Sequence, residues 1–412
     1  MARTIDEREH TLLYDWNRVG EQPNGGRVEL DDETLRDGLQ SPSVRRPPLE
    51  QKIELLHHME ALGIHAANIG YPGAGPRDLD DVTALAEEIG RNGFAISPNC
   101  AGRTVAADIE PIAEAQQRSG VPIEAAVFLG SSPIRQLVES WDLDFLVRTT
   151  SEAVSLARSL DMEVMYVTED TTRADPDHLR KMYRAAIEAG ARRICFSDTV
   201  GHATPWGVQA LMGFARELVE ETGEQVKIDY HGHRDRGLGV INALTALASG
   251  ADRVHGCALG IGERAGNAEM DLLLVNLHLL GWIEADLTAL PEYCRLASEA
   301  TGTPIPANYP AIGKDAFETS TGVHAAAILK AMEQNDTWLA NRIYSGVPAD
   351  DLGREQVVTI GPMSGQANVV AWLKQRDLPC EPETIKRIME RAKSSDRVLR
   401  DEDLADLVGA PA

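Results

Sequence analysis

The sequence predicts an α/β fold, a (β/α)8 TIM barrel followed by a small, mostly helical accessory region. Short β-type runs alternate with longer helical patterns from residue 27 to about residue 282, and the alternation can be followed eight times. Polar clusters recur just after the predicted strands. Strand and helix alternation indicates a parallel sheet, and eight repeats in about 250 residues favour a closed barrel over an open, doubly wound sheet.

The predicted strands are short runs rich in apolar residues, and the predicted helices carry apolar residues three and four positions apart. The strands are 27–32, 64–69, 94–98, 122–128, 162–168, 192–197, 225–230 and 253–258. Helix-like stretches lie between them at 49–62, 78–91, 176–189, 205–222 and 237–249. We therefore expect a barrel domain over residues 27–285, preceded by an N-terminal extension over 1–26.

The alternation stops after Trp282, and four prolines punctuate the segment from residue 291 to residue 310. Residues 316–342 then carry a helical pattern, 356–361 resemble a short strand, and 382–408 resemble two charged helices divided near Ser394. We expect residues 286–412 to form a linker and an accessory subdomain.

The composition narrows the class of partner. A formal net charge of −24 argues against nucleic acid and anionic membranes, since both require basic patches. The five cysteines are odd in number, widely spread and without CxxC spacing, as expected in a reducing compartment. Because there is no apolar run of about 18 residues and no apolar stretch near Met1, we expect a cytoplasmic protein.

The polar clusters predict a metal site at the barrel rim, where the active sites of such barrels lie. His231 and His233 alternate in an extended segment, so both imidazoles point the same way. Asp37 follows the first strand and could reach the same ion, and Asn267 could add an oxygen. An isolated HxH motif can also be a surface pair, and Asp37 could form an Asx turn beside Gly38. The shared rim favours a divalent metal, with Mg, Mn, Zn, Fe and Co all compatible.

Four ordered motifs resemble those of one enzyme family. They read Asp32–Gln40 (DETLRDGLQ), Asp198–Gly201 (DTVG), His231–His233 (HGH) and Gly260–Ala268 (GIGERAGNA). They are similar to the signatures of the metal-dependent acyl-CoA condensing enzymes and lyases that include 2-isopropylmalate, homocitrate and citramalate synthases and HMG-CoA lyase. The GIGERAGN form resembles the synthases, which favours condensation over cleavage. Cys257 does not match the position of the lyase cysteine, and we interpret it as a buried thiol at the end of a strand.

The resemblance implies a Claisen condensation of acetyl-CoA with a 2-oxo acid, in which CoA is released and a 2-alkylmalate-type product forms. A metal held by Asp37, His231 and His233 would chelate the 2-oxo acid. Arg36 would stabilise the developing alkoxide, although a structural salt bridge with Asp32 or Glu169 is an alternative.

The resemblance also implies roles for groups outside the metal set. Thr199 would bind the substrate carboxylate, and Glu169, His324 and Tyr344 are the candidates for the base. His324 and Tyr344 lie in the accessory region, so that region would have to cover a barrel mouth. In similar enzymes the mouth belongs to the partner subunit, which implies a homodimer, although His324 could equally be an ordinary helix-face histidine.

Several residues depart from the family pattern and bear on the choice of acceptor. Asn68 stands where many of these enzymes have a glutamate, and Arg135 stands where isopropylmalate synthases tend to have a histidine. With Arg103 and Gln40 these are our candidate substrate-binding residues. With Arg234 and Arg236, Arg135 suggests a 2-oxo acid with an anionic tail, as in homocitrate synthases, although solvent-facing arginines paired with nearby acids are an equal alternative. The leading hypothesis is a 2-isopropylmalate synthase-like enzyme, with a homocitrate synthase-like enzyme, an HMG-CoA lyase-like enzyme and a non-catalytic binding barrel as alternatives.

Overall fold

The computed structural model describes residues 7–18 and 28–408, which divide into two compact units. The first contains the described residues up to Asp286 together with Glu292–Pro304, and the second contains Leu287–Pro291 and the described residues from Ile305 onward. Before the barrel lie a short helix, α1 (Glu7–Leu12), and a 3-10 turn, η1 (Trp16–Arg18). Residues 1–6 and 19–26 of the predicted extension lie outside the described residues.

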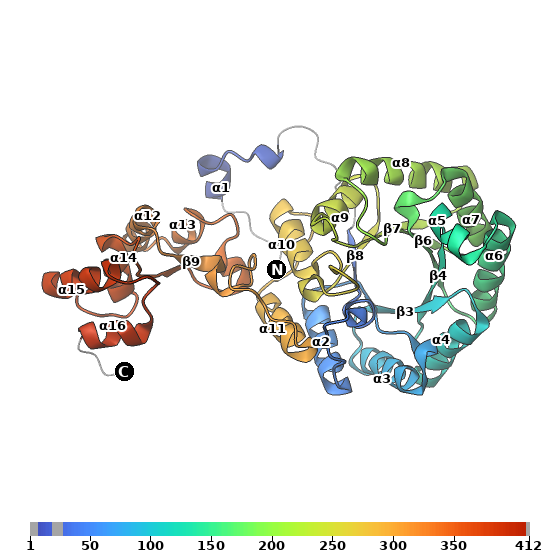
Figure 1. The fold of residues 1–412 in the computed structure, drawn as a ribbon, viewed down its shortest axis with the longest axis horizontal. Helices are drawn as coiled ribbons and strands as arrows, with labels where there is room; N and C mark the ends of the chain where they lie inside the picture. The colour runs from blue at the N-terminus through green and yellow to red at the C-terminus, as the bar shows by residue number, and fades with distance from the viewer. Residues whose placement is uncertain (1–6, 19–27, 409–412) are drawn as a thin grey trace. The chain divides into compact units, whose positions relative to one another are not determined.

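The first unit is a closed barrel of eight parallel strands with helices around it, as predicted (Figure 1). The order is β1 to β8, and β1 closes the ring by pairing with β8. The strands are β1 (Glu29–Asp32), β2 (Ala66–Asn68), β3 (Ser97–Arg103), β4 (Glu124–Gly130), β5 (Val164–Glu169), β6 (Arg193–Asp198), β7 (Lys227–Gly232) and β8 (Arg253–Gly256).

The helices follow the strands in turn. They are α2 (Leu49–Ala61), α3 (Pro76–Asn92), α4 (Ala106–Ser119), α5 (Pro133–Glu139), α6 (Leu143–Ser159), α7 (Pro176–Glu188), α8 (Pro205–Thr222), α9 (Gly239–Ala248), α10 (Met270–Leu280) and α11 (Leu290–Thr301). The capping of α8 is typical: Thr204 accepts a hydrogen bond from the Gly207 N–H, Pro205 follows it, and Gly223 ends the helix in the left-handed region.

Three predicted strands, those of β3, β4 and β7, are displaced by two or more residues at both ends. The third strand begins at Ser97, because Gly93 ends α3 with φ 63° and the Phe94 N–H still bonds to the Ile89 carbonyl. The strand then runs through small and polar residues that lack β propensity. The seventh strand extends to Gly232, so His231 lies within the strand instead of following it.

The interior of the barrel is unusually polar. Such barrels are commonly filled by layers of branched apolar side chains. Here buried charged residues come from β1, β7 and β8, and they include Asp31, Asp229, Arg253 and His255. The polar interior leads directly to the carboxyl ends of the strands, where the candidate site lies.

The second unit is mostly helical, as predicted. It contains α12 (Gly322–Glu333), α13 (Thr337–Arg342), α14 (Gln366–Lys374), α15 (Pro382–Lys393) and α16 (Asp401–Val408). A parallel pair of short strands, β9 (Glu318–Thr319) and β10 (Val357–Val358), accompanies them. One apolar cluster joins Val369, Trp372 and Leu373 of α14 to α15 and α16. The predicted helical stretch 316–342 therefore begins with a turn and a strand, and α14 was not predicted.

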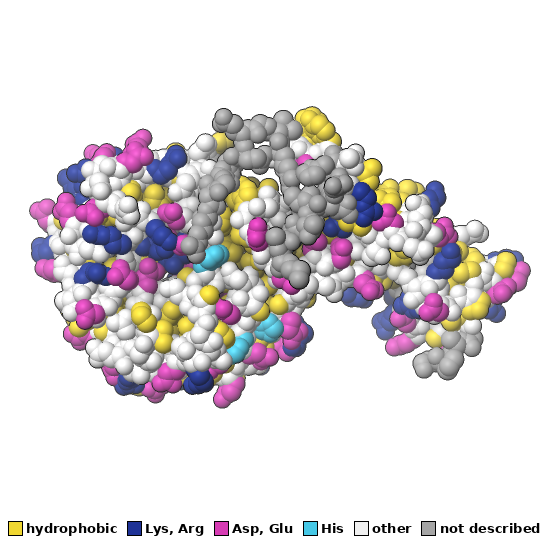
Figure 2. Space-filling model, turned by 180° about the vertical axis from the view of Figure 1, so that it is seen from behind, with side chains coloured by type: hydrophobic (Ala, Val, Ile, Leu, Met, Phe, Trp, Pro, Cys, Tyr) yellow, Lys and Arg dark blue, Asp and Glu magenta, His cyan; other side chains and the backbone are white. Residues whose placement is uncertain are grey.

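Acidic and basic side chains are interspersed over the face of the molecule seen in Figure 2. Among the described residues, no helix has both the length and the apolar character needed to cross a membrane.

Candidate active site

A cavity of about 320 Å³ opens at the carboxyl ends of the barrel strands. Its lining comes from every strand or from the loop just beyond it. The lining residues are Glu33, Arg36, Asp37, Gln40, Asn68, Tyr71, Ala101, Ala126, Phe128, Met165, Val167, Glu169, Cys195, Ser197, Thr199, His231, His233, His255, Glu263 and Arg264. Residues widely separated in the sequence therefore meet at the rim on which the prediction placed them.

Asp37, His231 and His233 form a compact, buried group in this cavity. The Nε2 atoms of the two histidines lie 3.4 Å apart, and Asp37 Oδ2 lies 3.3 Å from that of His231 and 3.5 Å from that of His233. Donors with this spacing can each lie about 2 Å from one common ion, the usual distance for nitrogen and oxygen ligands of zinc or magnesium. The three side chains thus fit a divalent metal.

Two unpartnered oxygens support that fit. Within the described part of the chain, Asp37 Oδ2 and Asn267 Oδ1 are buried without a hydrogen-bond partner. The Asn267 amide is oriented by its Nδ2, which donates to the Ile261 carbonyl at 3.1 Å. Asp37 caps no backbone N–H, so the Asx-turn alternative for this residue is wrong. Buried polar atoms are rarely left without a partner unless a ligand or water meets them.

The charges at the site suit a cation. Burial alone would raise the pKa of Asp37, but the Arg36 guanidinium and the two imidazoles hold it well below its usual range. Burial and the neighbouring His231 lower the pKa of His233 to about 4. Asp37 is therefore ionised and His233 neutral near pH 7, the protonation states that metal ligation requires.

Arg36 is held beside this group by Glu33. Its guanidinium contacts Glu33 Oε2 closely, and its Nη1 lies 3.5 Å from Asp37 Oδ1. The alternative salt bridge with Asp32 or Glu169 is not what the structure contains. Asp32 instead accepts hydrogen bonds from the Thr34 N–H and the Tyr293 hydroxyl. Arg36 still lines the cavity, so its charge faces the space available to a substrate.

Four predicted substrate or proton-transfer residues line the cavity, namely Gln40, Asn68, Glu169 and Thr199. Asn68 is 1% exposed, and neither its Nδ2 nor its Oδ1 has a partner among the described residues. Thr199 Oγ1 accepts the Asp170 N–H at 2.8 Å, which leaves its own hydroxyl hydrogen free to donate. Burial raises the pKa of Glu169, although the Arg135 and Arg36 guanidiniums oppose this effect.

Arg103 and Arg135 do not line the cavity. Arg103 Nε lies 2.7 Å from Asp108 Oδ2, and it also donates to the Tyr71 hydroxyl. Arg135 Nη2 lies 3.2 Å from Glu139 Oε1, and the guanidinium lies 5.7 Å from the centre of the Trp141 ring. Both guanidiniums thus already have acidic partners, and their substrate-binding roles stay predictions.

His324 and Tyr344 come together in the second unit. Their rings stack with centroids 3.9 Å apart and planes 22° from parallel. His324 lies in the first turn of α12, and Tyr344 follows α13. The association of the two residues is a feature of this unit alone, and their part in the chemistry stays a prediction.

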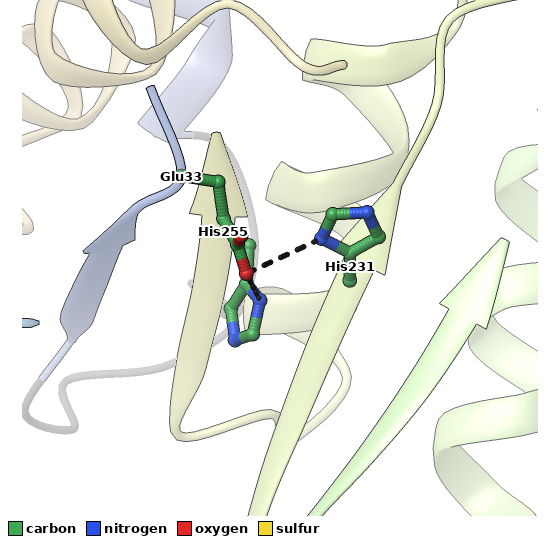
Figure 3. Close-up of side chains that lie close together, drawn as sticks. All are labelled: Glu33, His231 and His255. Carbon is green, nitrogen blue, oxygen red and sulfur yellow. Dashed lines mark ion pairs between the residues drawn. The ribbon is translucent and has the colours of Figure 1, made fainter. Parts of the chain in front are cut away.

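The sequence reasoning missed the residues directly beneath the metal group. Glu33 and His255, with His231, form a second close cluster, and the side chains point toward one another (Figure 3). His255 Nε2 lies 3.0 Å from Asp229 Oδ2, and Asp229 also holds Arg193 and Arg253 at 2.6 Å each. The available signal was the acidic run at residues 31–33 and the alternation of Arg253 with His255 on the last strand.

This ion network predicts a loss of stability at alkaline pH. Burial alone would lower the pKa of His255, but Asp31, Asp229 and Glu33 raise it to about 9. Because the pKa of His255 in the folded state lies above its ordinary value of 6.5, protonated His255 stabilises the fold fully below pH 6.5. This stabilisation disappears as the pH rises through 9. The protonated His255 contributes about 3 kcal/mol to the free energy of unfolding at low pH. We expect the free energy of unfolding of chelator-treated protein to fall over this range, and to fall much less for His255→Gln. Parallel curves for the two proteins would contradict the assignment.

The fold and the site together define a class, the TIM-barrel enzymes with a buried cluster that fits a divalent metal at the carboxyl ends of the strands. Residues 27–296 match the HMGL-like family, and the chain belongs to that family. It is 34% identical over 394 residues to a 2-isopropylmalate synthase of Heliobacterium modesticaldum, covering 93% of this chain and 73% of that protein. It is 29% identical over 387 residues to the homocitrate synthase AksA of Methanopyrus kandleri, covering 92% and 91%.

The solved structures support the fold alone. A hydroxymethylglutaryl-CoA lyase from Pseudomonas aeruginosa superposes with a TM-score of 0.54 at 19% identity, covering 66% of this chain and 92% of that one. The sequence relatives are acyl-CoA:2-oxo acid C-acyltransferases. The resemblance drawn from the four motifs is therefore confirmed at the level of the family, and the acceptor differs among the relatives.

Proposed function

We propose that this chain condenses acetyl-CoA with a 2-oxo acid to form a 2-alkylmalate-type product and free CoA. The observation that carries the proposal is the convergence of Asp37, His231 and His233 at one buried point beside Arg36. A divalent ion bound there supplies Lewis acidity and a template for the carboxylate and keto oxygens of the acceptor. The relatives named as 2-isopropylmalate and homocitrate synthases support the reaction class.

The other residues of the cavity bind the acceptor, transfer protons and stabilise the developing charge. Thr199 donates its hydroxyl hydrogen to the acceptor carboxylate. Glu169, whose pKa is raised, accepts a proton from the methyl group of acetyl-CoA. The resulting carbon nucleophile attacks the keto carbon, and Arg36 stabilises the alkoxide that forms on the former keto oxygen. Water then cleaves the thioester and releases CoA. His324 and Tyr344 are proposed as further proton-transfer groups, supplied by the partner subunit of a homodimer.

We infer that the acceptor carries an uncharged side chain, as 2-oxoisovalerate does. Much of the cavity wall is apolar or aromatic, and the Glu169 carboxylate would repel an anionic tail. The wall residues are Tyr71, Ala101, Ala126, Phe128, Met165 and Val167. The homocitrate-type acceptor remains the second candidate, because Arg135 is close enough to Glu169 for its charge to lower the pKa of that carboxyl.

Release of free thiol from acetyl-CoA, measured with a panel of 2-oxo acids, tests the reaction. We expect release that requires both a 2-oxo acid and a divalent metal, with chelator abolishing it and added metal restoring it. Release without a 2-oxo acid, or release that survives complete metal removal, would contradict the proposed condensation.

The variant Arg135→Ala separates the two acceptors. We expect kcat/KM for 2-oxoisovalerate to change less than about threefold, because the guanidinium is paired with Glu139 outside the cavity. If the enzyme uses 2-oxoglutarate, the same change should lower kcat/KM for that acceptor by about tenfold or more. Glu139→Gln, which alters the same ion pair from the other side, is the matched control. Strong 2-oxoglutarate activity that depends on Arg135 would reverse the assignment of the acceptor.

A further inference from the structure

Glu33 and His255 form a buried pair beside His231, one of the proposed metal ligands (Figure 3). Each residue is 2% exposed, and His255 Nδ1 lies 3.2 Å from Glu33 Oε1. The same carboxylate oxygen lies 3.9 Å from His231 Nδ1, and the other oxygen contacts Arg36. One carboxylate thus faces a proposed metal ligand, the proposed alkoxide-stabilising arginine and a second histidine.

The surroundings argue against a second metal ion between Glu33, His231 and His255. Both ring nitrogens of His255 face carboxylates, Nδ1 toward Glu33 and Nε2 toward Asp229. Nε2 is hydrogen-bonded to Asp229, and the carboxylates on both sides of the ring favour its protonated form, which has no lone pair to offer a metal. The Arg36 guanidinium on the remaining Glu33 oxygen would also repel a cation. The cluster is better explained as an ion pair that supports its neighbours.

The pair acts on the metal group through His231. At 3.9 Å the Glu33 carboxylate is too far from His231 Nδ1 for a direct hydrogen bond, so it acts through its charge, which favours a hydrogen on Nδ1 and leaves the Nε2 lone pair directed at Asp37 and His233. It acts on Arg36 through the Glu33 contact, which holds the guanidinium in the cavity wall. His255 contributes by fixing Glu33, because its other nitrogen is anchored to Asp229 on the neighbouring strand β7.

We propose that Glu33, fixed by His255, is a positioning residue that orients His231 as a metal ligand and Arg36 toward the substrate. The inference rests on the proposed function to the extent that Asp37, His231 and His233 bind a metal. It assigns a role to two side chains that touch neither the metal position nor the reacting atoms.

Binding of Co²⁺ to metal-free protein, measured by calorimetry and by the visible spectrum, tests the role of Glu33 without relying on turnover. We expect Glu33→Gln to bind Co²⁺ about 10- to 100-fold more weakly than the wild type and to shift the visible bands. His255→Gln should act in the same direction with a smaller effect. The double variant should be no worse than Glu33→Gln alone, because His255 acts through Glu33.

The matched control is Glu88→Gln. Glu88 pairs with His57 at 2.8 Å on helices α2 and α3, so it repeats the glutamate–histidine pair away from the site. We expect this variant to bind Co²⁺ as the wild type does. In steady-state kinetics, Glu33→Gln should lower kcat and leave the KM for acetyl-CoA within about twofold of the wild-type value. The metal-binding measurement distinguishes this result from a general loss of folded protein.

The outcomes separate the two proposals. A folded Glu33→Gln protein that binds Co²⁺ as tightly as the wild type would overturn the positioning role, as would additive effects in the double variant. If Glu33→Gln does not fold, Co²⁺ binding is measured on His255→Gln and Glu33→Asp instead. Wild-type affinity in both of these variants would likewise overturn the positioning role. A wild-type protein that binds no divalent ion at this site would instead defeat the proposed function.

Discussion

Replacing Asp37 with asparagine is expected to lower kcat by about three orders of magnitude and to abolish stoichiometric metal binding. Asp37 Oδ2 is the one carboxylate oxygen within 3.5 Å of both histidine Nε2 atoms among the described residues. Its loss removes the anionic donor of the group and leaves the Arg36 charge less compensated. A loss of about 4 kcal/mol of transition-state stabilisation corresponds to roughly a thousandfold in rate. Thiol release under saturating metal and substrate measures the effect.

Asp235→Asn is the matched control for Asp37→Asn. Asp235 lies two residues beyond His233 and pairs with Arg264 at 2.8 Å, at the rim of the same cavity. It has no place in the metal group, so we expect its variant to keep metal binding and to lose less than about tenfold in kcat. Asp37→Asn activity within tenfold of the wild type, at full metal loading, would exclude the proposed ligand set.

The barrel was predictable because its signals are local and repeated. The helices α2, α3, α7, α8 and α9 begin and end within about three residues of the predictions, since each carries a clear amphipathic pattern and recognisable ends. The third strand was displaced because its residues, among them Pro98, Asn99 and Gly102, lack the β-branched pattern. Pairing with both neighbouring strands overrides that weak local preference.

The grouping of Asp37, His231 and His233 was predictable because the three residues fall at the carboxyl ends of predicted strands. Strand order fixes which of these ends are neighbours. The neighbouring pair Glu33 and His255 was not predictable in the same way. Glu33 reads as one residue of an acidic run, and His255 as one polar residue on a strand. Their meeting depends on the register of β1 against β8, which places Asp31 opposite His255. Residues 29–33 read ELDDE and are polar on both faces, so the hydrophobic pattern only weakly specifies that register.

The partners of the arginines were equally hard to predict. A guanidinium is long and flexible, so several acids lie within its reach before the fold selects one. For Arg36 the alternative to an alkoxide-stabilising role was a salt bridge with Asp32 or Glu169, but the guanidinium contacts Glu33, and Asp32 is bonded to Thr34 and Tyr293. Arg135 pairs along its own helix with Glu139, as expected of an arginine paired with a nearby acid, and its part in binding the acceptor stays a prediction. The choice between acceptors therefore rests on the apolar cavity wall.

Replacing Asp229 with asparagine is expected to destabilise the barrel by about 3–5 kcal/mol, the usual consequence of breaking a buried ion pair from one side. Asp229 is fully buried, and its two oxygens hold Arg193 and Arg253 at 2.6 Å each, with His255 at 3.0 Å. Burial alone would raise the pKa of Asp229, but Arg253 and Arg193 hold it well below its usual range. The amide would leave three buried cations with too little negative charge. Urea unfolding followed by circular dichroism measures the change.

Glu221→Gln provides the comparison that isolates burial as the cause. Glu221 also holds two arginines, Arg180 at 2.5 Å and Arg184 at 2.7 Å, but it does so on the surface. Water screens exposed pairs, so we expect the free energy of unfolding of this variant to stay close to that of the wild type. Because Asp229 anchors His255, Asp229→Asn should also weaken Co²⁺ binding, whereas Glu221→Gln should not. Equal destabilisation by the two changes would show that the buried ion pairs of Asp229 stabilise the fold no more than the exposed ion pairs of Glu221.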